Sequence, residues 1–125
     1  MSPSPSDQRA AQRFPVRIHA RYRLLKSPDG EPPEPELHNG NNVISNLSRT
    51  GFFLATKNYL EIDSVIEVEF PLEQFQEMIR GEAEVVRANY QNFPNQGRYE
   101  YGLRFVTLHP HFHEVLEKFF KVVEG

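Results

Sequence analysis

The sequence contains no cysteine, so disulfides, thiol nucleophiles and metal sites built on thiolates are excluded. It also lacks any apolar run that approaches the roughly 20 residues of a membrane-spanning helix. The first seven residues, Met-Ser-Pro-Ser-Pro-Ser-Asp, have no apolar core of the kind that a secretory signal needs. We therefore expect a cytoplasmic protein without membrane insertion, and a flexible tail over residues 1–8.

Aspartate is scarce, since it occurs only at positions 7, 29 and 63 and never next to a histidine. Ser48 has no histidine near it in the sequence, and no glycine motif typical of an oxyanion hole accompanies it. These absences argue against catalysis, and we expect neither an enzyme nor a cofactor.

Three histidines, His109, His111 and His113, lie at alternate positions near the C-terminus. Alternate spacing can bring histidines together on a metal, but here they straddle a predicted helix start, where residues two apart diverge. No acidic or cysteine partner accompanies them. We expect these histidines to cap the helix and line the surface, without a metal.

Charge is unevenly distributed along the 125 residues, whose net charge is −3. Residues 1–26 carry six basic side chains against Asp7 alone, a net charge of +5, so the remainder has a net charge of −8. A local basic segment on an acidic body indicates a discrete anionic ligand more than a long nucleic acid.

Alternation of apolar and polar residues predicts about six short strands. They are expected at residues 14–25, 43–47, 51–56, 64–70, 78–90 and 98–108, with a helical turn near 71–75 and turns at 46–51 and 91–97. Residues 27–42 include four prolines within ten residues, which predicts a surface loop with a turn at Asn39-Gly40.

The period changes at the C-terminus, where apolar residues follow helical spacing. These are Phe112, Val115, Leu116, Phe119, Phe120 and Val123, and Pro110 suits a first helical turn. Short strands without helical crossovers predict a mainly β protein, a single antiparallel barrel or sandwich over residues 9–125 with a helix on one face or end. The pairs Phe52-Phe53 and Phe119-Phe120 are expected in its core rather than as a base-stacking platform.

Two motifs suggest where a ligand would bind. Arg9 and Arg13 lie four residues apart before the first strand, and Asn46-x-Ser48-x-x-Gly51 occupies a turn between strands. Arginine matches a phosphate, or the O6/N7 edge of guanine, in bidentate fashion. Asn46 and Ser48 can hold the turn or reach a ligand, and Gly51 allows a positive φ or close approach to the backbone.

Taken in order, the two motifs resemble those of the PilZ domain family. The resemblance extends over nearly the whole chain and includes Phe-Pro-Val after Arg13 and the late Tyr101-Gly-Leu-Arg-Phe105 segment. Arg13 and Arg17 also have the four-residue spacing. The pair Arg9 and Arg13 is preferred because the hydrophobic-Pro-hydrophobic segment follows its second arginine and because Arg17 falls on the polar phase of the strand.

The resemblance implies a six-stranded barrel with a C-terminal helix and a bacterial receptor for cyclic di-GMP. It places ligand contacts at Arg9, Arg13, Asn46, Ser48 and Gly51, with Arg17 as a secondary contact. The leading hypothesis is a stand-alone sensor, in which ligand binding orders the arginine arm and the signal passes to an unidentified protein partner.

Two other functions fit parts of the sequence. A PilZ-like adaptor that binds no nucleotide would act through its helix or barrel edge, although the arginines argue against it. A small barrel that binds single-stranded nucleic acid would use basic and aromatic residues, and the overall negative charge disfavours it.

Overall fold

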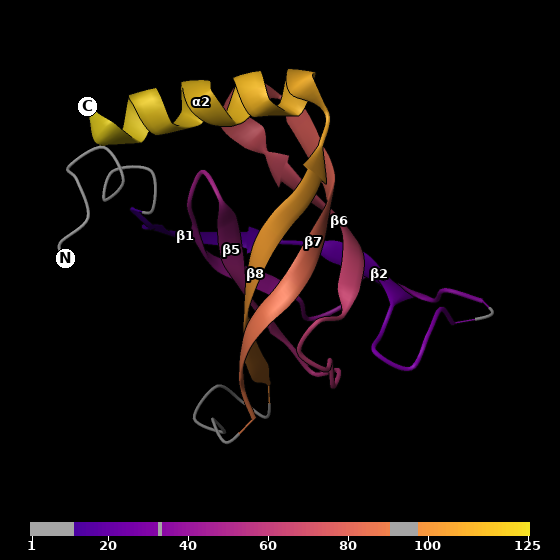
Figure 1. The fold of residues 1–125 in the computed structure, drawn as a ribbon. Coiled ribbons are helices and arrows are strands. Elements are labelled where there is room, and N and C mark those ends of the chain that lie inside the picture. The colour runs from indigo at the N-terminus through magenta and orange to yellow at the C-terminus, as the bar shows by residue number, and fades with distance from the viewer. Residues whose placement is uncertain (1–11, 33, 91–97) are drawn as a thin grey trace, which may run out of the picture.

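The computed structural model describes residues 12–32, 34–90 and 98–125. They form a curled sheet with one helix, α2, lying across an end of it (Figure 1). In chain order the elements are β1 (Phe14–His19), β2 (Arg21–Lys26), β3 (Leu37–His38), β4 (Val43–Leu47), β5 (Gly51–Thr56), β6 (Val65–Leu72), the short 3-10 helix η1 (Glu73–Phe75), β7 (Glu77–Asn89), β8 (Tyr99–Leu108) and α2 (Pro110–Glu124).

All the strand pairs are antiparallel, and the strand order is β1-β4-β5-β8-β7-β6-β2-β3. The mainly β class and the C-terminal helix are as predicted, but the sheet has eight strands where six were expected.

One added strand comes from a break in the predicted strand 14–25. The break falls at Ala20, whose N–H donates to the Asn42 carbonyl over 3.0 Å while the Asn42 side-chain amide donates to the Ala20 carbonyl over 3.4 Å. β1 then pairs with β4, and β2 pairs with β6. Residues 14–26 thus form one strand at one end of the strand order and another strand near the opposite end, which makes the sheet curl.

The other added strand lies inside the proline-rich segment 27–42, which was expected to be loop throughout. Leu37 and His38 form β3, which pairs with β2. In the predicted Asn39-Gly40 turn the left-handed backbone falls one residue later, at Asn41, whose φ is 62°. Asparagine tolerates this conformation because its short polar side chain can bond locally.

The core fills the inside of the curled sheet. β6 shows the cause most simply, since every second residue is buried: Ile66, Val68, Phe70 and Leu72. α2 adds Val115, Leu116, Phe119 and Phe120 from one face. Within the described ranges, no helix combines the length and the apolar character needed to cross a bilayer.

The start of α2 uses the local chemistry that the sequence predicts. Pro110 occupies the first turn, and the His109 side chain caps the helix because its Nδ1 accepts the His111 backbone N–H over 3.1 Å. The His111 ring lies 3.0 Å from a carboxylate oxygen of Glu77. Among the residues that the structure describes, no group of three or more His, Asp or Glu side chains is arranged to hold a metal ion.

Candidate ligand-binding surface

A row of residues crosses four neighbouring strands on the outer face of the barrel. Asn46 of β4 pairs with Phe53 of β5, Phe53 pairs with Gly102 of β8, and Gly102 pairs with Arg87 of β7. Residues directly opposite each other in a sheet share a face, so this row forms one continuous surface. We call these four residues the outer row.

Arg13 lies on the outer row. Its guanidinium carbon is 4.1 Å from the centre of the Phe53 ring, and its Nη1 donates to Asn46 Oδ1 over 3.3 Å. The first contact is a cation–π interaction, and the second joins the arginine motif to the Asn46–Gly51 motif. Two residues predicted to bind the ligand are therefore brought together from widely separated parts of the sequence.

Phe53 corrects one expectation. Its neighbour Phe52 is fully buried, and Phe119 and Phe120 are buried as predicted, but Phe53 is only half-buried and faces outward under Arg13. The alternation of β5 is the signal that could have revealed this, because adjacent strand residues point to opposite faces. Gly102 leaves room for the ring, since a Cβ there would lie 3.3 Å from Phe53 Cε1.

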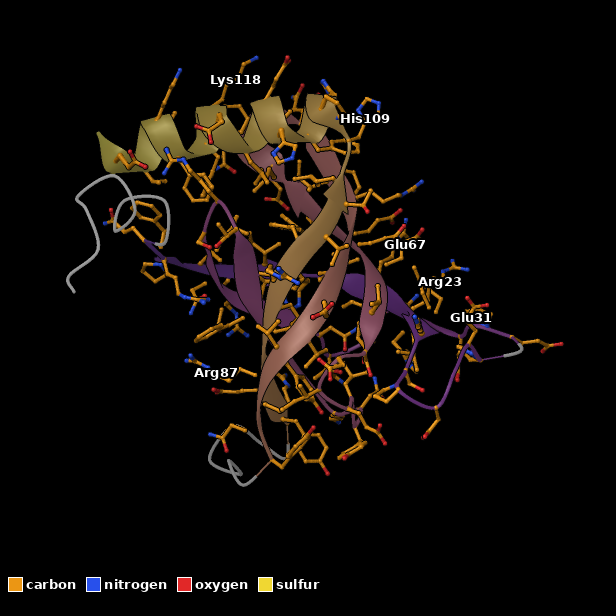
Figure 2. All side chains as sticks on the ribbon, in the orientation of Figure 1. Arg23, Glu31, Glu67, Arg87, His109 and Lys118 are labelled. Carbon is orange, nitrogen blue, oxygen red and sulfur yellow. The ribbon has the colours of Figure 1, made fainter. Side chains whose placement is uncertain are left out.

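Arg87 supplies a second positive charge to this surface, and the sequence motifs did not identify it. Partial burial lowers the pKa of Arg13, and the nearby charge of Arg87 lowers that pKa further. Arginine stays protonated in proteins, so this surface holds two cations, Arg13 and Arg87, that repel each other. Arg87 projects outward from the strand wall (Figure 2). An anion bound between the two guanidinium groups would relieve the repulsion.

Ser48 is buried in the hairpin that connects β4 to β5. Its hydroxyl oxygen accepts the backbone N–H groups of Thr50 and Gly51 over 3.2 and 3.1 Å, and the Ser48 N–H donates to the Gly51 carbonyl over 2.8 Å. Of the two roles considered for this side chain, holding the turn is therefore directly visible. Contact with a ligand stays a prediction.

The close approach of β8 explains why residue 51 is a glycine. A Cβ at this position would lie 1.9 Å from the Leu103 carbonyl oxygen of β8, far inside contact distance. The positive φ considered for Gly51 is not found, because positive φ among the described glycines is confined to Gly30 and Gly125. The glycine lets β5 and β8 approach each other, which keeps the turn beside the outer row.

Arg49 ties the same turn to α2. Its Nε donates to the two Glu117 carboxylate oxygens over 3.0 and 3.3 Å, and its Nη1 donates to Glu124 over 2.6 Å. Its guanidinium carbon also lies 4.8 Å from the centre of the Phe120 ring. The Glu124 hydrogen bond, followed by that of Glu117, raises the pKa of Arg49 despite partial burial. Figure 1 shows the hairpin at the start of β5 extending toward the helix.

The remaining predicted arginines occupy different positions. Arg9 lies outside the described residues. Arg17 is exposed on β1, as the polar phase of the strand predicts. It lines a hollow of about 340 Å³ together with His19, Glu73 and Phe119, a set of residues separate from those around Arg13.

This chain is similar to a known protein family and to several solved structures. A family model described as PilZ domain matches residues 7–121. Similar structures include the Bacillus subtilis inhibitor of motility MotI/DgrA, with 15% identity and a TM-score of 0.63 over 86% of this chain and 46% of that chain. MrkH of K. pneumonia in complex with c-di-GMP has 18% identity and a TM-score of 0.57 over 89% of this chain and 49% of that chain.

The PilZ domain of YcgR from Escherichia coli with c-di-GMP has 13% identity and a TM-score of 0.54 over 90% of this chain and 88% of that chain. The chain thus spans about half the length of MotI/DgrA and of MrkH. At these identities the similarity concerns the fold. The comparison with curated proteins found no match.

Proposed function

The chain belongs to the PilZ domain family, and on this premise we propose that it is a receptor for cyclic di-GMP that signals to a protein partner. The ligand would bind on the outer row, with Arg13, Asn46 and Arg87 in contact and Ser48 and Gly51 shaping the turn beside them. Arg9 would approach from the N-terminal arm, and Arg17 would make a secondary contact.

The observation that carries the proposal is the meeting of Arg13 with the outer row. Arg13 and Arg87 present two guanidinium groups, and Asn46 presents an amide, on a surface that also holds the Phe53 ring. Guanidinium groups bind phosphates and guanine edges, and aromatic or guanidinium planes stack on purines. The surface therefore has a group for each part of a guanine dinucleotide.

The comparisons support the same ligand. Two of the similar structures, MrkH and the PilZ domain of YcgR, are described as containing c-di-GMP. Their similarity to this chain concerns the fold alone, so the choice of ligand for this chain depends on Arg13 and its surroundings.

Calorimetric titration with cyclic di-GMP tests the proposal. We expect the wild type to bind and Arg13→Ala to bind about tenfold more weakly or worse, because a charge-assisted contact is lost. Arg23→Ala is the matched control, since Arg23 pairs with Glu67 at 3.7 Å and lies on the other side of the molecule from Arg87 in Figure 2.

The results of the titration distinguish the proposed function from its alternatives. Equal affinity in wild type and Arg13→Ala would remove Arg13 from the site, and absence of binding by the wild type would favour an adaptor that binds no nucleotide. Competition with GTP distinguishes a cyclic dinucleotide site from a general site for guanine and phosphate. The titration also gives the number of ligands bound per chain.

A further inference from the structure

The turn that carries the Asn46–Gly51 motif is bonded directly to α2. Arg49 is the residue that makes the connection, and its side chain is only 20% exposed. Its partners Glu117 and Glu124 lie seven residues apart on the helix, with Phe120 between them. Residues at this spacing share one helical face, so a single guanidinium group holds nearly two turns of α2.

Phe120 of α2 contacts Arg49 and also the start of the strand that follows Arg13. Its ring lies 5.5 Å from the ring of Phe14, the residue that follows Arg13, and 4.8 Å from the guanidinium carbon of Arg49. Phe120 is fully buried. Phe14, at the start of β1, and Arg49, in the Asn46–Gly51 turn, therefore both contact α2 at the same ring.

The charges around Arg49 oppose an anionic ligand. Two carboxylates surround one guanidinium group, which leaves this cluster with a net charge of −1. Cyclic di-GMP carries two phosphate charges, which would be repelled by Glu117 and Glu124 and attracted by Arg49. Arg49 lies within the Asn46–Gly51 turn, so a ligand bound at the turn would compete with the two carboxylates for its guanidinium group.

We propose that Arg49 is a ligand-sensitive latch between the binding surface and α2. Cyclic di-GMP bound at the outer row draws Arg49 away from Glu117 and Glu124, and residues 117–124 of α2 loosen and present a new surface to the protein partner. This inference rests on the proposed function and adds the route by which binding is reported. Arg49 acts as a positioning residue in the free protein and as a phosphate ligand in the bound one.

Thermodynamic linkage gives the first test. If ligand and helix compete for Arg49, removing the helix carboxylates must raise ligand affinity by the same coupling. Calorimetry on Glu117→Gln/Glu124→Gln is expected to show cyclic di-GMP binding about fivefold tighter or better than wild type. Arg49→Ala is expected to bind more weakly than wild type.

The matched control is Glu31→Gln/Glu34→Gln, which makes the same change in net charge on the exposed loop that precedes β3. Figure 2 shows Glu31 on this loop, on the other side of the molecule from Arg87. Its affinity should stay within about twofold of wild type, because charges separated by more than a Debye length are largely screened. Tighter binding in the control would attribute the effect to net charge and overturn the latch.

Amide hydrogen exchange gives the second test. In the wild type, exchange of residues 117–124 should rise several-fold when cyclic di-GMP is added, because the latch opens. In Glu117→Gln/Glu124→Gln, exchange there should be high without ligand and change little on binding.

The outcomes separate this inference from the proposed function. Binding with no change, or with slower exchange in residues 117–124, overturns the latch alone. The same holds if the double variant binds more weakly than wild type, since the ion pairs would then only support the turn. A wild type that binds no cyclic di-GMP overturns both proposals.

Discussion

At the scale of single residues, the Asn46–Gly51 motif divides into one side chain that belongs to the outer row and others that build the hairpin. Asn46 faces outward and bonds Arg13, whereas Ser48 is buried and accepts two backbone N–H groups. Gly51 is required by the approach of the Leu103 carbonyl. A motif associated with binding thus also contains the residues that fix the position of its outward-facing member.

The role of Gly51 leads to a prediction. Gly51→Ala should destabilise the protein by about 2–3 kcal/mol, because a Cβ 1.9 Å from the Leu103 carbonyl forces β5 and β8 apart. Gly40→Ala is the matched control, since nothing lies within 4 Å of a Cβ there. Urea denaturation of both variants measures the difference. Equal stability of the two variants would show that the strands separate at little cost.

Sequence reasoning reached part of the surface. It identified Arg13 and Asn46, which lie in contact, because both belong to local motifs. It missed Arg87 and placed Phe53 in the core. Their positions follow from the pairing of β5, β8 and β7, which are far apart in the sequence. Register between distant strands is set when the whole sheet assembles, and local spacing carries no information about it.

At the scale of elements, β2, β6 and β7 are joined on the outer face by an ionic cluster. Arg21, Glu69 and Arg80 lie opposite one another on the three strands, and Glu69 bonds both arginines. Partial burial raises the pKa of Glu69, but the hydrogen bonds and charges of Arg21 and Arg80 outweigh it and bring the pKa below its ordinary value of 4.5.

The lowered pKa of Glu69 gives a pH-dependent prediction. A carboxyl whose pKa is lower in the folded state adds stability above its unfolded pKa, and this stability is lost as the pH falls through the folded value. Glu69→Gln should therefore lower the free energy of unfolding by about 1 kcal/mol at pH 7 and by much less near pH 3. The effect at pH 7 is modest because the two arginines are about half exposed.

Urea denaturation of wild type and Glu69→Gln at the two pH values measures this difference. Glu67→Gln is the control at pH 7, since its pair with Arg23 is longer, at 3.7 Å, and more exposed. A cost for Glu69→Gln that is the same at both pH values would contradict the assignment.

The elements themselves were largely predictable, because alternation and helical spacing are local properties. β4, β5 and β8 lie where the pattern predicts them, and α2 begins at the expected proline. The break at Ala20 was not predictable, since no glycine or proline marks it. It depends on hydrogen bonds with Asn42, more than twenty residues away in the sequence.

At the scale of the whole molecule, a basic N-terminal segment belongs to an acidic protein. The net charge is −3, while residues 1–26 are strongly basic. A basic site on a protein of the same sign as its ligand attracts the ligand at short range and repels it at long range. Such a balance favours a small dianion over a polyanion.

Salt dependence measures this balance. We expect the affinity for cyclic di-GMP to fall with increasing salt, with a shallow log–log slope, because salt screens the attraction between the guanidinium groups and only two phosphates. Titrations between low and moderate salt give the slope. A slope several times steeper, together with binding of oligonucleotides, would indicate a nucleic-acid binding protein instead.

The outer row has a further consequence for how the protein is made. Asn46 and Phe53 belong to the first half of the chain, whereas Arg87 and Gly102 are synthesised late. During translation, Arg13 leaves the ribosome well before the strands that complete its surroundings. Folds dominated by such distant pairings form slowly, so the surface is assembled only after synthesis is nearly complete. A ligand that binds this surface and not the unfolded chain would stabilise the finished fold by mass action, and the abundance of the protein would then rise with the concentration of that ligand.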